Sequence, residues 1–235
     1  MEKYRSVCVY AIVGDDRRSR GVNAVAAFSS ITSMYETAKP PHFLQIHMGD
    51  IEQADIDAFN ESFEGVTYWQ TAAMIDLYGD DISVTGDSDS YTLSDCRLNI
   101  SLVKQNEVYD VLLDEKRTPL DLTSGQIGVP MIILDQYDIF LGDQITVSSG
   151  GVQKRFTAAA YVYDGMMNSI MCSSTRFLIS DEDFDTLLGN IGETILLKHI
   201  LQTARLRQPT RQPMIRAIRS CQKTGRLSLT LSYSF

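Results

Sequence analysis

The stretch Ser124–Val147, SGQIGVPMIILDQYDIFLGDQITV, is the part of the chain around which the other elements are predicted to be arranged. Ile127–Val129 is a short β-rich run, and Met131–Phe140 then carries apolar residues at helical spacing. Pro130 suits the first turn of a helix because the N–H that it lacks would be unpaired there, and Gly142 can take the positive φ that ends a helix. The stretch therefore predicts a strand, a short helix, a tight turn and a second strand.

Upstream of this stretch, the pattern predicts a β-α-β unit. His42–His47 alternates as a strand does, and Val66–Leu77 is typical of a second strand. Asp50–Phe63 between them begins with an N-capping aspartate and has apolar residues on one face. A crossover helix of this kind allows the two strands to pair in parallel. A further helix, Val22–Thr37, precedes the unit and is ended by Lys39-Pro40-Pro41.

The middle of the chain is predicted to be mainly β. Glycine-rich turns favour hairpins, because glycine adopts the backbone angles that such turns need. A serine followed by an acid three residues later predicts the start of a helix. The predicted elements, in order, are a polar loop over Gly79–Ser90, strands over Leu98–Val103 and Val108–Leu113, a loop over Asp114–Thr123, a hairpin of Gln144–Val147 and Val152–Tyr163 joined by Ser148–Gly151, a strand over Phe177–Ile179, and a helix from Ser180 through Leu188 that Gly189 ends.

Three motifs together resemble a known family. They are S-G-x-I-x-V-P followed by L-G-D-x-I-x-V in the opening stretch, DGMMNSIMCSSTRFLIS at Asp164–Ser180, and AKPPHFLQIHMGDI at Ala38–Ile51. The first two resemble the extracytoplasmic domain of FtsX-like, MacB-like ABC transporter permeases. The third is similar to the segment that follows the first membrane helix in such permeases from Gram-positive bacteria. The resemblance covers approximately Val22–Gly192.

The predicted fold class is α+β, with a small α/β (β-α-β) layer and an inserted, mainly β subdomain. Residues 1–37 are predicted to be an N-terminal segment and helix that would follow or join the first membrane helix. Residues 38–97 and 173–192 would form the α/β subdomain, 98–172 the inserted β subdomain, and 193–235 a basic tail of doubtful origin. In the family, a further strand would follow the helix that starts near Ser180 and would close the α/β layer.

The resemblance implies a non-catalytic function. The chain would be a soluble domain on the extracytoplasmic face of the cell membrane, coupling a partner ABC ATPase to export or to an extracellular partner. That partner would be a peptide, a lipid or a protein, and the full transporter is a candidate dimer. Two alternatives from other classes are a secreted or surface hydrolase and a free-standing interaction module.

Charge is distributed very unevenly along the chain. All 30 acidic residues lie at or before Glu193, whereas eight of the 21 lysines and arginines lie after it. The acidic body argues against nucleic acid as a partner, since such binding needs a basic surface. We interpret the change at Glu193 as an altered reading frame, a gene-model error or a foreign fusion, and expect the tail not to complete the α/β layer; a basic segment for anionic lipid is the alternative. In the family, the residues before Val22 would belong to the first membrane helix, but the charges in Asp15–Arg20 are too costly to place in lipid. We therefore expect that the chain either begins after the membrane span or starts with foreign sequence.

No catalytic, cofactor-binding or metal-binding residue is predicted. His42 and His47 fall on opposite faces of a strand, and neither a G-x-S-x-G elbow nor a phosphate-binding G-x-x-x-x-G-K-[ST] loop is present. The acids between Asp80 and Asp89 lack the order of a calcium loop, so a solvated turn is the preferred interpretation.

Two further features leave alternatives open. The methionine-rich segment Asp164–Arg176 is interpreted as a hinge between the subdomains, with methionines filling gaps in the core as the alternative. Cys96 and Cys172 are interpreted as two buried thiols, and a disulfide between them is the alternative in an oxidising compartment.

Overall fold

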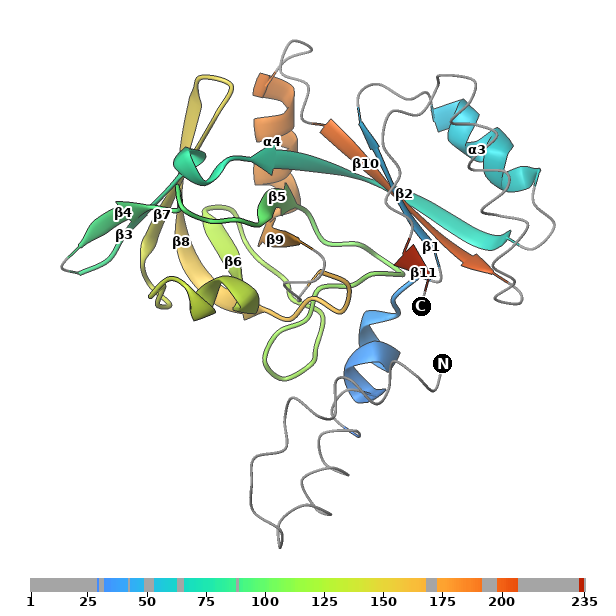
Figure 1. The fold of residues 1–235 in the computed structure, drawn as a ribbon, viewed down its shortest axis with the longest axis horizontal. Coiled ribbons are helices and arrows are strands. Elements are labelled where there is room, and N and C mark those ends of the chain that lie inside the picture. Colours follow the sequence, from blue (N-terminus) through green and yellow to red (C-terminus); the bar gives the residue numbers. More distant parts are fainter. Residues whose placement is uncertain are drawn as a thin grey trace, which may run out of the picture.

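The computed structural model describes residues 29, 32–41, 43–48, 53–62, 66–87, 89–167, 173–191, 198–206 and 233–234. These residues form one mixed sheet of eleven strands with helices packed against it (Figure 1). Within them, no helix is both long and apolar enough to cross a bilayer. The elements are a helix over residues 32–38, β1 (Phe43–Met48), α3 (Gln53–Glu61), β2 (Val66–Leu77), η1 (Gly79–Asp81), β3 (Ile82–Thr85), β4 (Ser90–Thr92), β5 (Asn99–Val103), β6 (Gln126–Pro130), η2 (Met131–Asp135), β7 (Gln144–Ser149), β8 (Val152–Val162), β9 (Ser174–Ile179), α4 (Asp181–Ile191), β10 (Lys198–Leu206) and β11 (Tyr233–Ser234).

The sheet has two differently built ends. The strand order is β11-β1-β10-β2-β5-β9-β6-β8-β7-β3-β4. Helix α3 covers the end formed by β1, β10 and β2 (Figure 1). At this end Trp69 Nε1 of β2 donates to Asp57 Oδ1 of α3 at 2.9 Å. The other end, from β6 to β4, consists of strands joined by turns and by the short 3₁₀ helices η1 and η2. The fold is therefore of the α+β class, as predicted, with a β-α-β layer at one end and a mainly β region at the other.

The first β-α-β unit differs from the prediction in one respect. Strands β1 and β2 run in the same direction, but β10 lies between them and pairs antiparallel with both, for example Leu201 with Ile46 and with Ala72. The prediction that the tail does not complete the α/β layer is therefore wrong. Strand β10 follows α4 along the chain and completes this layer.

The prediction about the tail was wrong because it used the charge and proline content of the whole segment 193–235, which differs from the content of β10 alone. Within β10 the only charged residues are Lys198 at the first position and Arg205 near the end, while the other six basic residues and both prolines of the tail follow Leu206. Pairing of a strand depends on its backbone N–H and C=O groups, which net charge does not alter. Nine residues with few charges were enough to form a central strand.

The opening stretch forms the strands that were predicted but a shorter helix. Strands β6 and β7 are present, and the β7–β8 hairpin turns at two glycines with positive φ, Gly150 and Gly151. The helix predicted over Met131–Phe140 is a 3₁₀ helix that stops at Asp135. It stops because the N–H groups further along bond elsewhere: that of Phe140 donates to Asp143 Oδ2 at 2.8 Å, and that of Gly142 to the Ala158 carbonyl at 2.8 Å. Gly142 does have a positive φ of 104°, but in the turn before β7 rather than at a helix end.

Two more predictions in the middle of the chain are wrong. Gly79–Ser90 is not one loop, because it contains η1 and β3 and reaches the first residue of β4. Strand β3 pairs with both β4 and β7 and thereby extends the mainly β end of the sheet, although the predicted boundary placed it in the α/β part. Val108–Leu113 is not a strand; Asp110 has a φ of 57°, which interrupts extended backbone, and only Leu113 forms isolated bridges.

Helix α4 continues past the glycine that was predicted to end it. Ser180 caps the helix as predicted, since its Oγ accepts the N–H of Asp183 at 3.3 Å, but the helix runs through Gly189 to Ile191. Glycine within a helix costs about 1 kcal/mol relative to alanine. Phe184 and Leu187 of α4 are 0% and 1% exposed, and burial of each such side chain contributes about 1.5–3 kcal/mol, which outweighs that cost.

Candidate functional site

A buried arginine holds two aspartates that come from distant parts of the chain. Arg176 Nε and Nη2 donate to the two carboxylate oxygens of Asp164, both at 2.7 Å. Its Nη1 and Nη2 donate to the carboxylate of Asp110 at 2.5 and 2.9 Å. All three side chains are at most 2% exposed. We call these three residues the arginine junction.

Each residue of the junction is placed by local structure. Arg176 lies in β9, beside Ser101 of the parallel strand β5. Asp164 follows β8 after Tyr163, and its Oδ1 also accepts the backbone N–H groups of Met166 and Met167 at 2.7 and 2.9 Å. Asp110 adopts a left-handed backbone, which aspartate tolerates better than most residues because its short side chain bonds locally. The junction thus ties the segment before β6 and the end of β8 to β9.

The two aspartates titrate differently because their surroundings differ. Burial raises the pKa of Asp110, although Arg176 opposes this effect. Burial also disfavours the charge of Asp164, but Arg176 and the N–H groups of Met166 and Met167 lower its pKa below the ordinary value. Burial likewise opposes the charge on Arg176, whose pKa the two carboxylates nevertheless raise. With one cation facing two carboxylates, Asp110 is the first group of the junction to accept a proton.

The helix of residues 32–38 ends on this junction. The N–H of Asp110 donates to the Lys39 carbonyl at 3.1 Å, and that of Val111 to the Ala38 carbonyl at 2.9 Å. Ala38 and Val111 are buried together with Leu113, and Met34 of the helix packs against them. The helix is thus fixed to the same short segment whose carboxylate Arg176 holds.

The same segment also closes the base of the β region. Leu113 and Tyr163 exchange both backbone hydrogen bonds, N–H to carbonyl, at 3.1 and 2.8 Å. The side chain of Gln105 adds two bonds, since its Nε2 donates to the carbonyls of Leu112 at 2.8 Å and Leu120 at 2.9 Å. The segment that enters the β region at Leu113 and the segment that leaves it at Tyr163 are therefore hydrogen-bonded to each other beside the arginine junction.

A second polar contact joins α4 to the β region. The buried carboxylate of Asp183 accepts bonds from Ser124 Oγ at 2.7 Å, the N–H of Gly125 at 2.7 Å and Lys154 Nζ at 2.5 Å. Burial alone would raise the pKa of Asp183, but the hydrogen bonds from Lys154, Gly125 and Ser124 outweigh it and lower the pKa. Asp183 also lies in the first turn of α4, where the helix dipole favours a negative charge.

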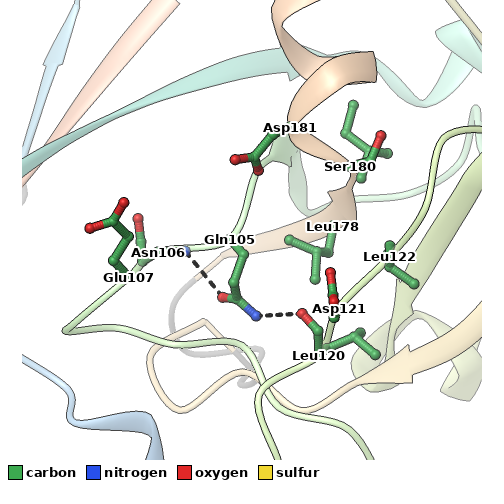
Figure 2. Close-up of a pocket in the computed structure, with 10 residues that line it drawn as sticks. Gln105, Asn106, Glu107, Leu120, Asp121, Leu122, Leu178, Ser180 and Asp181 are labelled. Atoms are coloured by element: carbon green, nitrogen blue, oxygen red, sulfur yellow. Dashed lines mark hydrogen bonds between the residues drawn. The ribbon is translucent and has the colours of Figure 1, made fainter.

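A shallow hollow of about 280 Å³ lies where the parallel strands β5 and β9 end, beside the start of α4 (Figure 2). Its lining includes the carboxylates Glu107, Asp121 and Asp181 over apolar side chains such as Leu178. Figure 2 shows Gln105 in the middle, with its amide bonded to Asn106 and Leu120. The ten lining residues include no histidine, cysteine, lysine or arginine.

The candidates considered from the sequence are not gathered into a site by the described structure. His47 lies in β1, and His42 lies outside the described residues. In the parts of the chain that the structure describes, no group of three or more potential ligands is arranged to hold a metal ion. Cys96 is half-buried, and Cys172 lies outside the description, so their pairing stays an open alternative.

In the methionine-rich segment, the core-filling interpretation is confirmed for two methionines, whereas the hinge between the subdomains stays a prediction. Met166 and Met167 are buried at 6% and 7% exposure and pack with Leu112 and Leu178, so these two methionines do fill the core. Met171 is outside the described residues. The two ends of the segment, Asp164 and Arg176, are the residues that the sequence analysis did not recognise as partners.

Comparisons with solved structures find several similar chains, among them the two that follow. No family model and no curated protein matches the chain. The crystal structure of the periplasmic region of MacB from Actinobacillus actinomycetemcomitans matches with a TM-score of 0.44 and 10% identity, over 87% of this chain and 94% of that one. A domain of a putative permease protein from Porphyromonas gingivalis matches with a TM-score of 0.41 and 14% identity, over 78% of this chain and 84% of that one.

Proposed function

We propose that the chain is the extracytoplasmic domain of an FtsX-like, MacB-like ABC transporter permease of the Gram-positive type. In this function it catalyses no reaction. It passes movement between a partner ATPase, reached through membrane helices, and a peptide, lipid or protein outside the cell. The motifs in Ala38–Ile51, Ser124–Val147 and Asp164–Ser180 are the sequence features that favour this family.

The observation that carries the proposal is the attachment of the helix of residues 32–38. In a permease of this kind, that helix would follow the first membrane helix. Here its end is bonded through Ala38 and Lys39 to Val111 and Asp110, and Asp110 is held by Arg176. A displacement of the helix would therefore act on a buried, fully bonded group rather than on a pliable loop.

From the junction, the displacement has two routes. Through Asp164 it reaches the end of β8 and hence the mainly β region. Through Arg176 it reaches β9 and then α4, which Asp183 ties to the β region a second time. Packed elements with satisfied polar contacts move as units, so the domain would transmit a displacement instead of absorbing it.

The test uses the full-length product of the gene, expressed in its native host. Tyr78 is 68% exposed, so Tyr78→Cys offers a site for a membrane-impermeant maleimide. We expect labelling in intact cells above the background of the unsubstituted protein, recovery in the membrane fraction, and co-purification of a subunit with a phosphate-binding loop. Labelling only after lysis, or a product absent from the membrane fraction, would contradict the proposal and favour an enzyme or a free-standing module.

A further inference from the structure

Two large apolar side chains that are neighbours in sequence are exposed on the turn before β7. Phe140 is 63% exposed and Leu141 is 52% exposed. Single exposed apolar residues are ordinary on protein surfaces, whereas two large ones side by side in the sequence of one turn are less common. We call Phe140 and Leu141 the apolar tip.

The apolar tip is held in place by the backbone beneath it. The N–H of Phe140 donates to Asp143 Oδ2, and the N–H of Asp143 donates back to the Phe140 carbonyl at 3.1 Å. On the β8 side, Ala158 bonds both neighbours of the turn: its carbonyl accepts from Gly142 at 2.8 Å, and its N–H donates to the Asp143 carbonyl at 2.9 Å. Ile139 next to the tip is buried at 2% exposure. Binding through such a turn loses little conformational entropy, because the turn is already ordered.

Two tyrosines in the same region add a half-exposed aromatic surface. The rings of Tyr91 and Tyr137 are stacked, with centroids 6.1 Å apart and planes 8° apart. Tyr91 OH donates to the Asp138 carbonyl at 2.8 Å, and Tyr137 OH donates to Asp95. Tyrosine is enriched in binding hot spots because it offers a rigid apolar face and a polar end.

The surroundings of the tip are acidic. No lysine or arginine occurs between Lys39 and Arg97, nor between Arg117 and Lys154, and these stretches supply the β3–β4 hairpin and the tip. Asp138 and Asp143 flank the tip in sequence. Burial and these two carboxylates raise the pKa of Tyr91, which places their negative charge beside the tyrosine pair.

We propose that the apolar tip, with its tyrosine pair, binds a basic amphipathic segment of a partner protein. The apolar face of the segment would contact Phe140 and Leu141, and its lysines or arginines would face Asp138 and Asp143. The local charge argues against the other occupants. A second copy presenting the same face, or an anionic lipid surface, would be repelled by these carboxylates.

This inference goes beyond the proposed function and does not depend on it, because binding at the tip can be measured on the purified chain alone. The contact area is small, so we expect micromolar rather than nanomolar affinity at low salt. The probe is a synthetic amphipathic helix with leucine on one face and lysine on the other. Its matched control carries glutamate in place of lysine.

The decisive variant is Phe140→Ser/Leu141→Ser, which leaves every charge and every backbone bond of the turn in place. Its matched control is Tyr78→Ser, which removes an exposed aromatic residue elsewhere. By fluorescence anisotropy, we expect the double variant to bind the lysine peptide about tenfold or more weakly than wild type, and Tyr78→Ser to bind it within about twofold. Equal melting temperatures of the three proteins will show that each is folded.

A charge test separates the tip from general attraction to an acidic protein. Asp138→Lys should weaken binding of the lysine peptide, whereas Asp121→Lys, at the hollow of Figure 2, should weaken it less. Equal affinity of the double variant and wild type would overturn the proposal. So would tighter binding of the glutamate peptide, tip-dependent binding to phosphatidylglycerol vesicles, or tip-dependent self-association in sedimentation.

Discussion

Replacing Arg176 by methionine should destabilise the fold strongly. Methionine has nearly the length of the arginine stem but cannot donate, so two carboxylates that are each 2% exposed would lose their cation. Breaking a buried ion pair by removing one partner costs about 3–5 kcal/mol, whereas the whole domain is stabilised by about 5–15 kcal/mol. For a chain of this size, that loss corresponds to a fall in melting temperature of about 6–20 °C.

The assay is urea unfolding at pH 7, followed by circular dichroism, with thermal melting as a second measure. The control is Arg155→Met, because Arg155 lies exposed on β8 and its replacement should change stability by no more than about 0.5 kcal/mol. If Arg176→Met lost less than about 1 kcal/mol, the junction would not be a buried charge network and the reasoning would be refuted. A second variant, Arg176→Met with Asp110→Asn and Asp164→Asn, should recover part of the loss, since it leaves no unpaired charge.

The pH dependence gives an independent check on the same variant. Without Arg176, burial raises the folded-state pKa of Asp110 and Asp164 above their unfolded values, so the folded variant binds protons more tightly and gains stability as the pH falls from 7. In the wild type, the pKa of Asp164 is lowered, so its stabilising contribution is lost as the pH falls below the unfolded value of about 3.9. The stability difference between the two proteins should therefore narrow towards acidic pH. A constant difference between pH 7 and 4 would contradict this account.

Four further substitutions, one of them with a control, test other parts of the fold. Gly142→Val should cost about 1–3 kcal/mol of unfolding free energy through backbone strain alone, since the φ of Gly142 is 104° and nothing lies within 4 Å of the added Cβ. Gly189→Ala inside α4 should instead stabilise the fold by about 0.5–1 kcal/mol, because alanine is the better helix former. Thr175→Val should be neutral or stabilising in a thermal melt, because the buried Thr175 Oγ1 has no hydrogen-bond partner among the described residues. Leu201→Pro, with Leu201→Val as control, should cost more than about 2 kcal/mol, since β10 is paired on both edges; a neutral result would mean that β10 is not part of the sheet.

The strands that the sequence predicted well are those with long or cleanly bounded patterns. Val66–Leu77 has the same bounds in the structure, and the β6 and β7 segments are fixed by Pro130 and by the glycine turn that follows β7. Strand β3 was missed because its four residues lie among aspartates and glycines, although its alternating burial follows the period of a strand. The α/β layer was only half predicted, since a strand inserted between β1 and β2 comes from more than 100 residues further along, and local pattern carries no information about such partners.

The arginine junction was missed for a different reason. A single arginine in the run Thr175–Ile179, which is otherwise mostly apolar, indicates a buried charge, and a buried arginine requires carboxylates. That signal was available, but it does not select the partners from 30 acidic residues. Asp164 lies 12 residues away and Asp110 lies 66 residues away, and no periodicity links either to β9. They reach Arg176 because the Leu113–Tyr163 bridge closes the base of the β region, so the identity of the partners is a property of the topology rather than of any local motif.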